Sequence, residues 1–134
     1  MDKIRLCIGT NDGENIAKTH MGDTKVFHIY DILKNTENEF IEKRVNKVQY
    51  MDHANTDKME QIIGIARDAD VFVAHQKSKN FVRIASTTKY QPVIVKVEKI
   101  SEILSVLNNS FQEIEEYVER RKNGEFFNTI PEFK

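Results

Sequence analysis

The chain has 134 residues, of which 40% are apolar and 31% are charged. This length suits one domain and is sufficient to bury a hydrophobic core without disulfides or a structural metal. The 20 basic and 21 acidic side chains give a formal net charge of −1. Because this balance lacks the positive field that drives nonspecific nucleic-acid binding, neither DNA nor RNA is a predicted partner.

The sequence predicts a protein of the reducing cytoplasm. No apolar run approaches the roughly 18 residues of a membrane-spanning helix, so no contact with a membrane is expected. The first residues read directly into a strand, without the apolar region of a secretory signal. Cys7 is the only cysteine, which excludes an intrachain disulfide and a Cys-x-x-Cys site. We interpret Cys7 as a small buried hydrophobe, the alternative being a reactive or metal-binding thiol.

Three strands are predicted in the first third of the chain. Apolar residues alternate over residues 4–9, and Gly-Thr-Asn-Asp-Gly then provides turn chemistry. β-Branched and aromatic residues at 25–32 and 40–45 flank a polar turn, which favours an antiparallel hairpin.

The middle of the chain alternates between helices and strands. Apolar residues on one face predict a helix over residues 57–68, and the continuous apolar run 71–74 is typical of a strand buried on both faces. Ser78 begins a short helix, and residues 93–95 form the last predicted strand. This alternation implies that the strands at 4–9, 71–74 and 93–95 are parallel.

The last third is predicted to be helical. An apolar stripe runs over residues 100–118, and a capping-box pattern at Ser110 predicts either a kink or two consecutive helices. The basic cluster 120–122 is interpreted as a helix end rather than a phosphate site. The phenylalanine-rich tail 125–134 is expected either to dock on an apolar surface or to join a partner chain.

Three motifs follow the first strand in order: Asp-Gly-Glu-Asn-Ile at residues 12–16, His-Met-Gly at 20–22 and Phe-His-Ile-Tyr-Asp at 27–31. Their order and spacing resemble the start of the dinitrogenase iron-molybdenum cofactor biosynthesis family. The resemblance implies an α/β domain with a ribonuclease H-like motif, a five-stranded mixed sheet in the order 3-2-1-4-5 with helices on its faces. It assigns residues 1–108 to the family domain and 109–134 to a C-terminal helical extension and tail of the same domain.

The resemblance also implies a function, because characterised relatives carry iron-sulfur cofactor precursors or the finished cofactor during nitrogenase assembly. It predicts a noncatalytic carrier for an iron-sulfur or iron-molybdenum cofactor precursor, not stably bound, with a cofactor-assembly or acceptor protein as partner. His20 of the His-Met-Gly motif is the predicted metal ligand, since an imidazole nitrogen suits iron, although a loop histidine can instead hydrogen-bond the backbone. Asp12, Gly13 and Gly22 are predicted to shape the turn around this cofactor site.

The chain departs from the family pattern at several points. Met21 replaces the usual phenylalanine, and the Gly/His-rich or Cys-containing segment before the first helix is reduced to residues 51–55. His75, Lys77 and Ser78 occupy the segment that usually carries glycines. Lys77 and the amides near Ser78 remain candidates for holding an anionic cofactor, and His75 is either a second ligand or a boundary residue. Because ligands bind at the carboxyl ends of parallel strands, the site is expected where loop 11–22 faces segment 75–78.

Two other functions stay open. A metal-dependent nuclease of ribonuclease H-like fold would need carboxylates, but the first strand offers Arg5, Cys7 and Gly9 instead. A protein-interaction adaptor that kept the fold and lost the cofactor would use the C-terminal segment, either for a partner or for a homo-oligomer. His28 alternates with apolar strand residues and is interpreted as a sheet residue rather than a ligand.

Overall fold

The computed structural model describes residues 1–51 and 56–134, so His53 of the shortened segment lies outside the described residues. Among these described residues, six strands form one mixed sheet in the order β3-β2-β1-β4-β5-β6. The strands are β1 (Lys3–Thr10), β2 (Val26–Leu33), β3 (Asn38–Val45), β4 (Val71–Ala74), β5 (Gln91–Val95) and β6 (Glu132–Phe133). β1, β4, β5 and β6 pair in parallel, and β2 pairs antiparallel with β1 and β3. The predicted mixed sheet and its order 3-2-1-4-5 are therefore confirmed.

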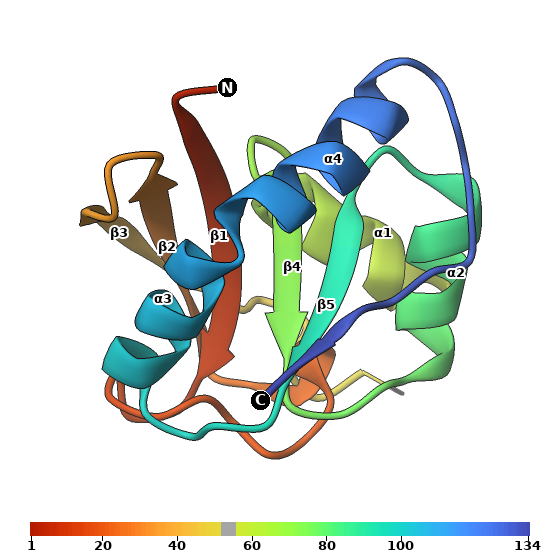
Figure 1. Ribbon diagram of the computed structural model, residues 1–134. Helices are drawn as coiled ribbons and strands as arrows, with labels where there is room; N and C mark the ends of the chain where they lie inside the picture. The colour runs from red at the N-terminus through yellow and green to blue at the C-terminus, as the bar shows by residue number, and fades with distance from the viewer. Residues whose placement is uncertain (52–55) are drawn as a thin grey trace.

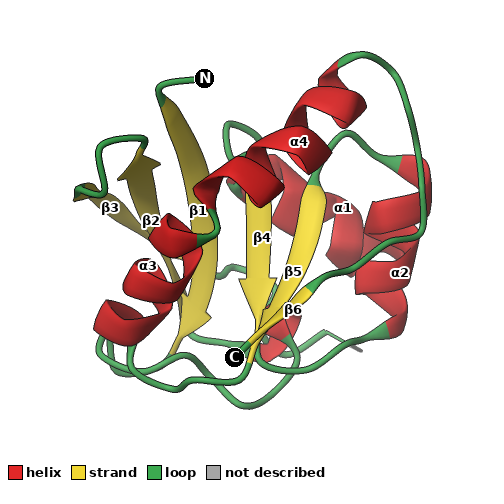
Figure 2. Cartoon of the chain, viewed as in Figure 1, coloured by secondary structure: helices red, strands yellow, loops and turns green. Residues whose placement is uncertain are grey.

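In the described part of the chain, four α-helices cover the two faces of this sheet. The helical segments are η1 (Met21–Asp23, a single 3₁₀ turn), α1 (Thr56–Ile65), α2 (Lys79–Thr87), α3 (Ile100–Asn109) and α4 (Phe111–Lys122). Figure 1 shows α3 and α4 in front of the sheet and α1 and α2 on its far side, and Figure 2 shows β6 at the edge next to β5. Because side chains of a strand alternate between faces, Leu6 and Ile8 pack under α3 and α4, whereas Cys7 packs toward α1 and α2.

The buried thiol of Cys7 behaves as a core residue. Burial raises the pKa of Cys7 far above its usual value, so the thiolate is not populated at neutral pH. In the part of the chain that the structure describes, no helix is long and apolar enough to cross a membrane.

Of the two alternatives predicted for residues 100–118, a kink or two consecutive helices, the structure has two helices, α3 and α4. The predicted capping box at Ser110 is wrong. The Ser110 side chain caps nothing, and its backbone N–H donates to the carbonyl of Leu107 at 3.1 Å. Ser110 has φ −103° and ψ 17°, which keeps it close to the helical region rather than the extended region that a cap needs. The chain therefore turns between α3 and α4 without a side-chain cap.

The tail docks on its own chain and adds a strand that the sequence did not predict. Ile94 N–H donates to the carbonyl of Pro131 at 2.9 Å, and Lys96 N–H donates to that of Phe133 at 3.0 Å. Consequently the strand at residues 91–95 is not the last one. Phe133 is buried in the core beneath α4.

Arg121, from the basic cluster at the end of α4, anchors this tail. Arg121 is 1% exposed, and its guanidinium donates to the side-chain oxygen of Gln91 and to the carbonyls of Ala85, Thr88 and Phe127. Burial lowers the pKa of Arg121 to about 10, so the group stays charged at neutral pH. The helix itself ends as predicted, since Gly124 adopts φ +90° and its N–H donates to the carbonyl of Arg121.

Candidate functional site

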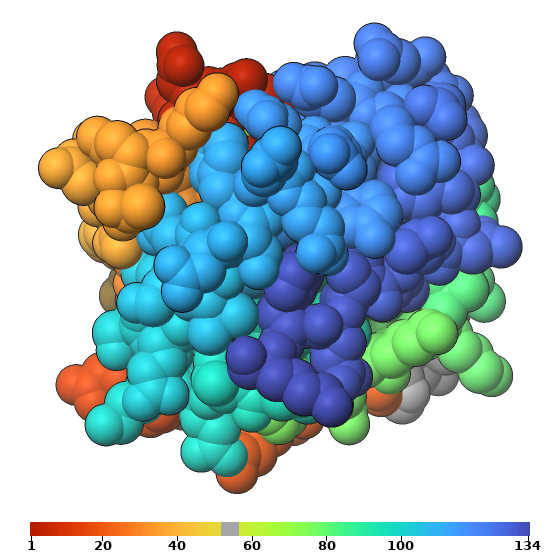
Figure 3. All heavy atoms as spheres, viewed as in Figure 1, coloured from red at the N-terminus to blue at the C-terminus, as the bar shows by residue number. Residues whose placement is uncertain are grey.

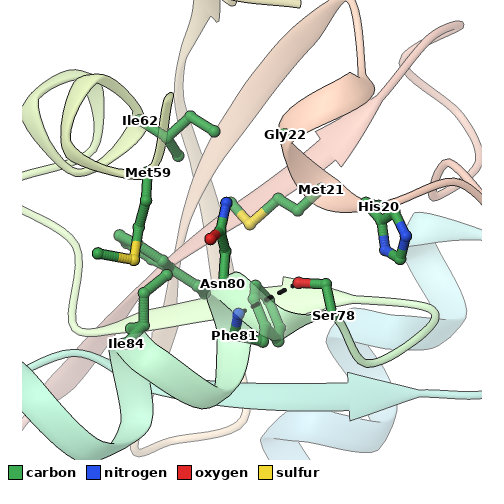
Figure 4. Close-up of a pocket in the computed structure, with 10 residues that line it drawn as sticks. His20, Met21, Gly22, Met59, Ile62, Ser78, Asn80, Phe81 and Ile84 are labelled. Carbon is green, nitrogen blue, oxygen red and sulfur yellow. Dashed lines mark hydrogen bonds between the residues drawn. The ribbon is translucent and has the colours of Figure 1, made fainter. Parts of the chain in front are cut away.

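A small pocket lies between η1, α1 and α2, at the carboxyl end of β4. Its walls come from three segments that are distant in sequence (Figure 4). The lining residues are His20, Met21, Gly22, Met59, Ile62, Phe72, Ser78, Asn80, Phe81 and Ile84. The cavity volume is about 20 Å³, which is room for about one water molecule.

One wall is the η1 turn, which begins directly after His20. Met21 is 5% exposed and faces the core, so the turn is fixed by an apolar contact. Gly22 permits the close approach of α1, because a Cβ at this position would lie 2.9 Å from Cδ1 of Ile62 and 3.1 Å from Cε of Lys58. The glycine of the His-Met-Gly motif therefore serves the packing of the pocket wall.

Lys58 ties this wall to the segment before α1. Its ammonium group is fully buried and donates to the carboxylate of Asp23 in η1. It also donates to the carbonyls of Met51 at 2.6 Å and Gln49 at 3.2 Å. A buried charge is stable only when it is paired and hydrogen-bonded, and these three acceptors meet that requirement.

The opposite wall is the start of α2. Ser78 is extended, with φ −130° and ψ 167°, and its hydroxyl oxygen accepts the N–H of Phe81 at 3.1 Å. The predicted helix start at Ser78 is confirmed. Phe81, whose N–H this cap accepts, is buried in the core and 3% exposed. Asn80 accepts a hydrogen bond from Arg83 at 3.1 Å and completes the wall.

The structure brings some of the predicted site residues together and separates others. His20, Gly22 and Ser78 line one pocket, as expected from loop 11–22 facing segment 75–78. His75 and Lys77 follow β4 but do not line this pocket. The carbonyl of His75 instead accepts a hydrogen bond from the ammonium group of Lys96 at 3.2 Å. His20, His28 and His75 are all half-buried.

Asp12 and Gly13 close a loop of their own and do not line the His20 pocket. The Asp12 carboxylate accepts the side-chain amide of Asn15 and the backbone N–H groups of Asn15 and Glu14, which lower the pKa of Asp12 to about 2. Gly13 has φ +79° and packs against His28, whose Cε1 would lie 3.1 Å from an added Cβ. This loop and the His20 pocket are thus two separate places.

Sequence reasoning missed most of the pocket lining. The apolar lining residues appear in the sequence only as core positions of helices and strands, because a core residue and a pocket residue have the same periodicity. Asn80 had no signal beyond its place in the first turn of α2.

The carboxylates around β1 and β2 are paired with arginines. Asp31 is buried and accepts two hydrogen bonds from the Arg5 guanidinium, at 2.9 and 3.1 Å. Asp68 pairs with both Arg44 and Arg5. The hydrogen bonds from Arg44, the larger effect, and from Arg5 outweigh the opposing effect of burial, so the pKa of Asp68 lies well below its usual value. Among residues 1–51 and 56–134, no three His, Cys, Asp or Glu side chains converge to hold a metal ion.

A mixed sheet in the order 3-2-1-4-5 with helices on both faces defines the ribonuclease H-like class of α/β domains. Within this class, the model of the dinitrogenase iron-molybdenum cofactor family matches residues 2–110, and the chain belongs to that family. The match includes the His20 pocket and ends at the start of α4. No curated protein matches the chain.

Proposed function

We propose that this chain is a noncatalytic carrier for an iron-sulfur-type cofactor or its precursor, with His20 as the protein ligand to a cofactor iron. Two observations support the proposal. The family to which the chain belongs is that of the dinitrogenase iron-molybdenum cofactor. His20 lines a pocket at the carboxyl end of a parallel strand, which is where α/β sheets bind ligands.

The geometry at His20 favours binding at the mouth of the pocket. The Nδ1 atom of His20 is buried, so Nε2 is the nitrogen that would meet a ligand arriving from solvent. A cavity with room for one water cannot enclose a cluster of several iron and sulfur atoms. The cofactor would rest on the opening, with the polarisable thioethers of Met21 and Met59 beneath it (Figure 4).

A site with few protein ligands suits a protein that passes its cargo on. In the described part of the chain, no cluster of three or more metal-binding side chains supplements His20. Retention would then depend on one imidazole and on weaker contacts at the rim, for which Lys77, Ser78 and His75 are our candidates. Such a cofactor is held reversibly and can move to an acceptor protein.

Anaerobic titration with an iron-sulfur cofactor precursor tests the carrier function. Wild type should take up about one equivalent, followed by visible absorbance. Because loss of even a supporting residue weakens metal sites 10- to 100-fold, His20→Ala should weaken uptake by at least about tenfold. His28→Ala is the matched control, since His28 is equally half-buried but lies outside the pocket.

Two results would contradict the proposal. Equal loss in His20→Ala and His28→Ala would remove His20 as the ligand. No uptake by wild type would remove the carrier function altogether and leave the adaptor as the better account.

The structure offers less support for the two alternatives. An adaptor that used its tail would need the tail free, but Phe133 is buried against its own chain and Phe127 stacks on Arg121, with 4.0 Å between the guanidinium carbon and the ring centroid. A nuclease would need carboxylates open to metal ions, but Asp31 and Asp68 are engaged by arginines.

A further inference from the structure

A second hollow lies at the same end of the sheet as the His20 pocket but on the opposite face. It is open to solvent, with a volume of about 500 Å³, within the range of small-molecule sites. The lining residues are Asn11, Asp12, Gly13, Lys25, Val26, His28, Phe40 and Lys43. Residues of the β2–β3 hairpin line it, and Figure 3 shows the orange end of this hairpin beside α3.

Three aromatic rings form a continuous surface on this side of the hairpin. The ring centroids of His28 and Phe40 are 5.1 Å apart, those of Tyr30 and Phe40 are 5.2 Å apart, and those of His28 and Tyr30 are 6.2 Å apart. Tyr30 is half-buried beside the core under α3, whereas Phe40 is 53% exposed. The rings are inclined to one another by 41° to 61°, so a planar ligand has the exposed ring of Phe40 on which to stack, with the other two rings at its edge.

Two lysines that line the hollow carry positive charge without an ion-pair partner among the described residues. Lys25 and Lys43 are exposed and have no ion-pair partner among the described residues, unlike Lys18, which pairs with Glu98 at 2.6 Å. The carboxylate that lines the hollow, Asp12, already accepts three N–H groups of its own loop. Two ammonium groups beside an exposed aromatic ring suit a ligand that is both planar and anionic.

His28 adds an aromatic ring to this surface. Its Nδ1 is buried, so this nitrogen is not open to a ligand in the hollow. Burial, and to a lesser degree the charge of Lys43, lower the pKa of His28, so the imidazole is neutral at pH 7. A neutral ring lies beside the two lysines without repelling them, so their charge remains available to an anion.

We propose that this hollow is a second ligand site, which binds a single nucleotide with its base on the exposed ring of Phe40 and its phosphate between Lys25 and Lys43. Two lysines suffice for one phosphate, whereas a chain with a net charge of −1 lacks the extended positive surface that a polynucleotide needs. The site also gives the Asp12–Gly13 loop a role that the His20 pocket does not. It is independent of the carrier function, because the sheet separates the two sites.

Isothermal titration of the intact chain with adenosine 5′-monophosphate tests the site. Saturable binding at one site per chain is expected. Lys25→Glu with Lys43→Glu should abolish it, and Phe40→Ser should weaken it at least about fivefold, as expected for the loss of a base-stacking ring. Lys47→Glu and Phe126→Ser are matched controls, since Lys47 is exposed, Phe126 is 57% exposed and both lie outside the hollow.

Parallel titrations distinguish the other outcomes. No saturation by the nucleotide, or equal weakening by the control variants, would overturn the proposal. Inorganic phosphate binding as tightly as the nucleotide would show that the rings take no part and would also overturn it. A short single-stranded oligonucleotide that binds much more tightly than the nucleotide would replace a mononucleotide site with a nucleic-acid surface.

Discussion

At the scale of single residues, the Asp-Gly motif after β1 builds a loop that closes on itself. The hydroxyl of Thr10 donates to the carbonyl of Asn15 at 2.6 Å and accepts the N–H of Gly13 at 3.0 Å. Asp12 accepts the neighbouring N–H groups, as Asp residues in turns commonly do. This motif therefore fixes a backbone shape, and its carboxylate is stabilised in the charged form.

The lowered pKa of Asp12 predicts an acid-dependent contribution to stability. The pKa is about 2 in the folded protein against an ordinary value of 3.8. The stabilisation is therefore fully present above pH 3.8 and is lost as the pH falls toward 2. We expect the melting temperature of wild type to fall more steeply between about pH 4 and pH 2 than that of Asp12→Asn. Parallel profiles of the two proteins would contradict this role.

Buried cations mark the limit of what could be predicted residue by residue. His20 and Ser78 could be placed together from sequence because both follow the carboxyl ends of parallel strands. Lys58 and Arg121 could not, since lysine and arginine are almost always surface residues unless a folded backbone surrounds them with acceptors. Those acceptors are mostly backbone carbonyls, two of them more than 30 residues from Arg121 in the sequence, and no local pattern of residue types encodes where they lie.

At the scale of elements, two serines with similar sequence signals behave differently. Ser78 and Ser110 both precede a helix, but only Ser78 is extended and caps it. We expect Ser78→Ala to lower the free energy of unfolding by about 1 kcal/mol, the usual value of a lost cap. Ser110→Ala should change it by less than about 0.5 kcal/mol, as at sites that lack such a feature. Urea denaturation of both variants measures the difference.

A comparable loss in the two serine variants would mean that Ser110 caps α4 in solution. The sequence could not separate the two cases, because the capping-box pattern describes residue types and not the backbone angles before the helix.

The strand β6 could not be predicted from the sequence for a related reason. A two-residue strand carries no periodicity, and it forms only because β5 has a free edge beside it.

At the scale of the whole molecule, the segment beyond the family match completes one face of the sheet. The match ends at residue 110, whereas the core beneath α3 continues into α4 and β6. Phe111, Ile114 and Val118 are 7%, 0% and 2% exposed and belong to the same core as Val93 and Val95 of β5. The C-terminal extension therefore shares the hydrophobic core of the matched region.

This packing predicts that the matched region does not fold cooperatively on its own. Burial of three large apolar side chains contributes about 1.5 to 3 kcal/mol each, or about 5 to 9 kcal/mol in all. Domains of this size are stable by only about 5 to 15 kcal/mol, so a chain that ends at Ser110 should lose most or all of its stability. Thermal unfolding followed by circular dichroism should show no cooperative transition for this shortened chain.

A chain that ends at Gly124 separates the contribution of α4 from that of the tail. It keeps the three apolar side chains of α4 and loses β6, Phe133 and the carbonyl of Phe127 that Arg121 donates to. We expect it to unfold cooperatively but at a lower temperature than the full chain. If the chain that ends at Ser110 unfolded as cooperatively as the one that ends at Gly124, α4 would be an appendage on a self-sufficient domain rather than part of its core.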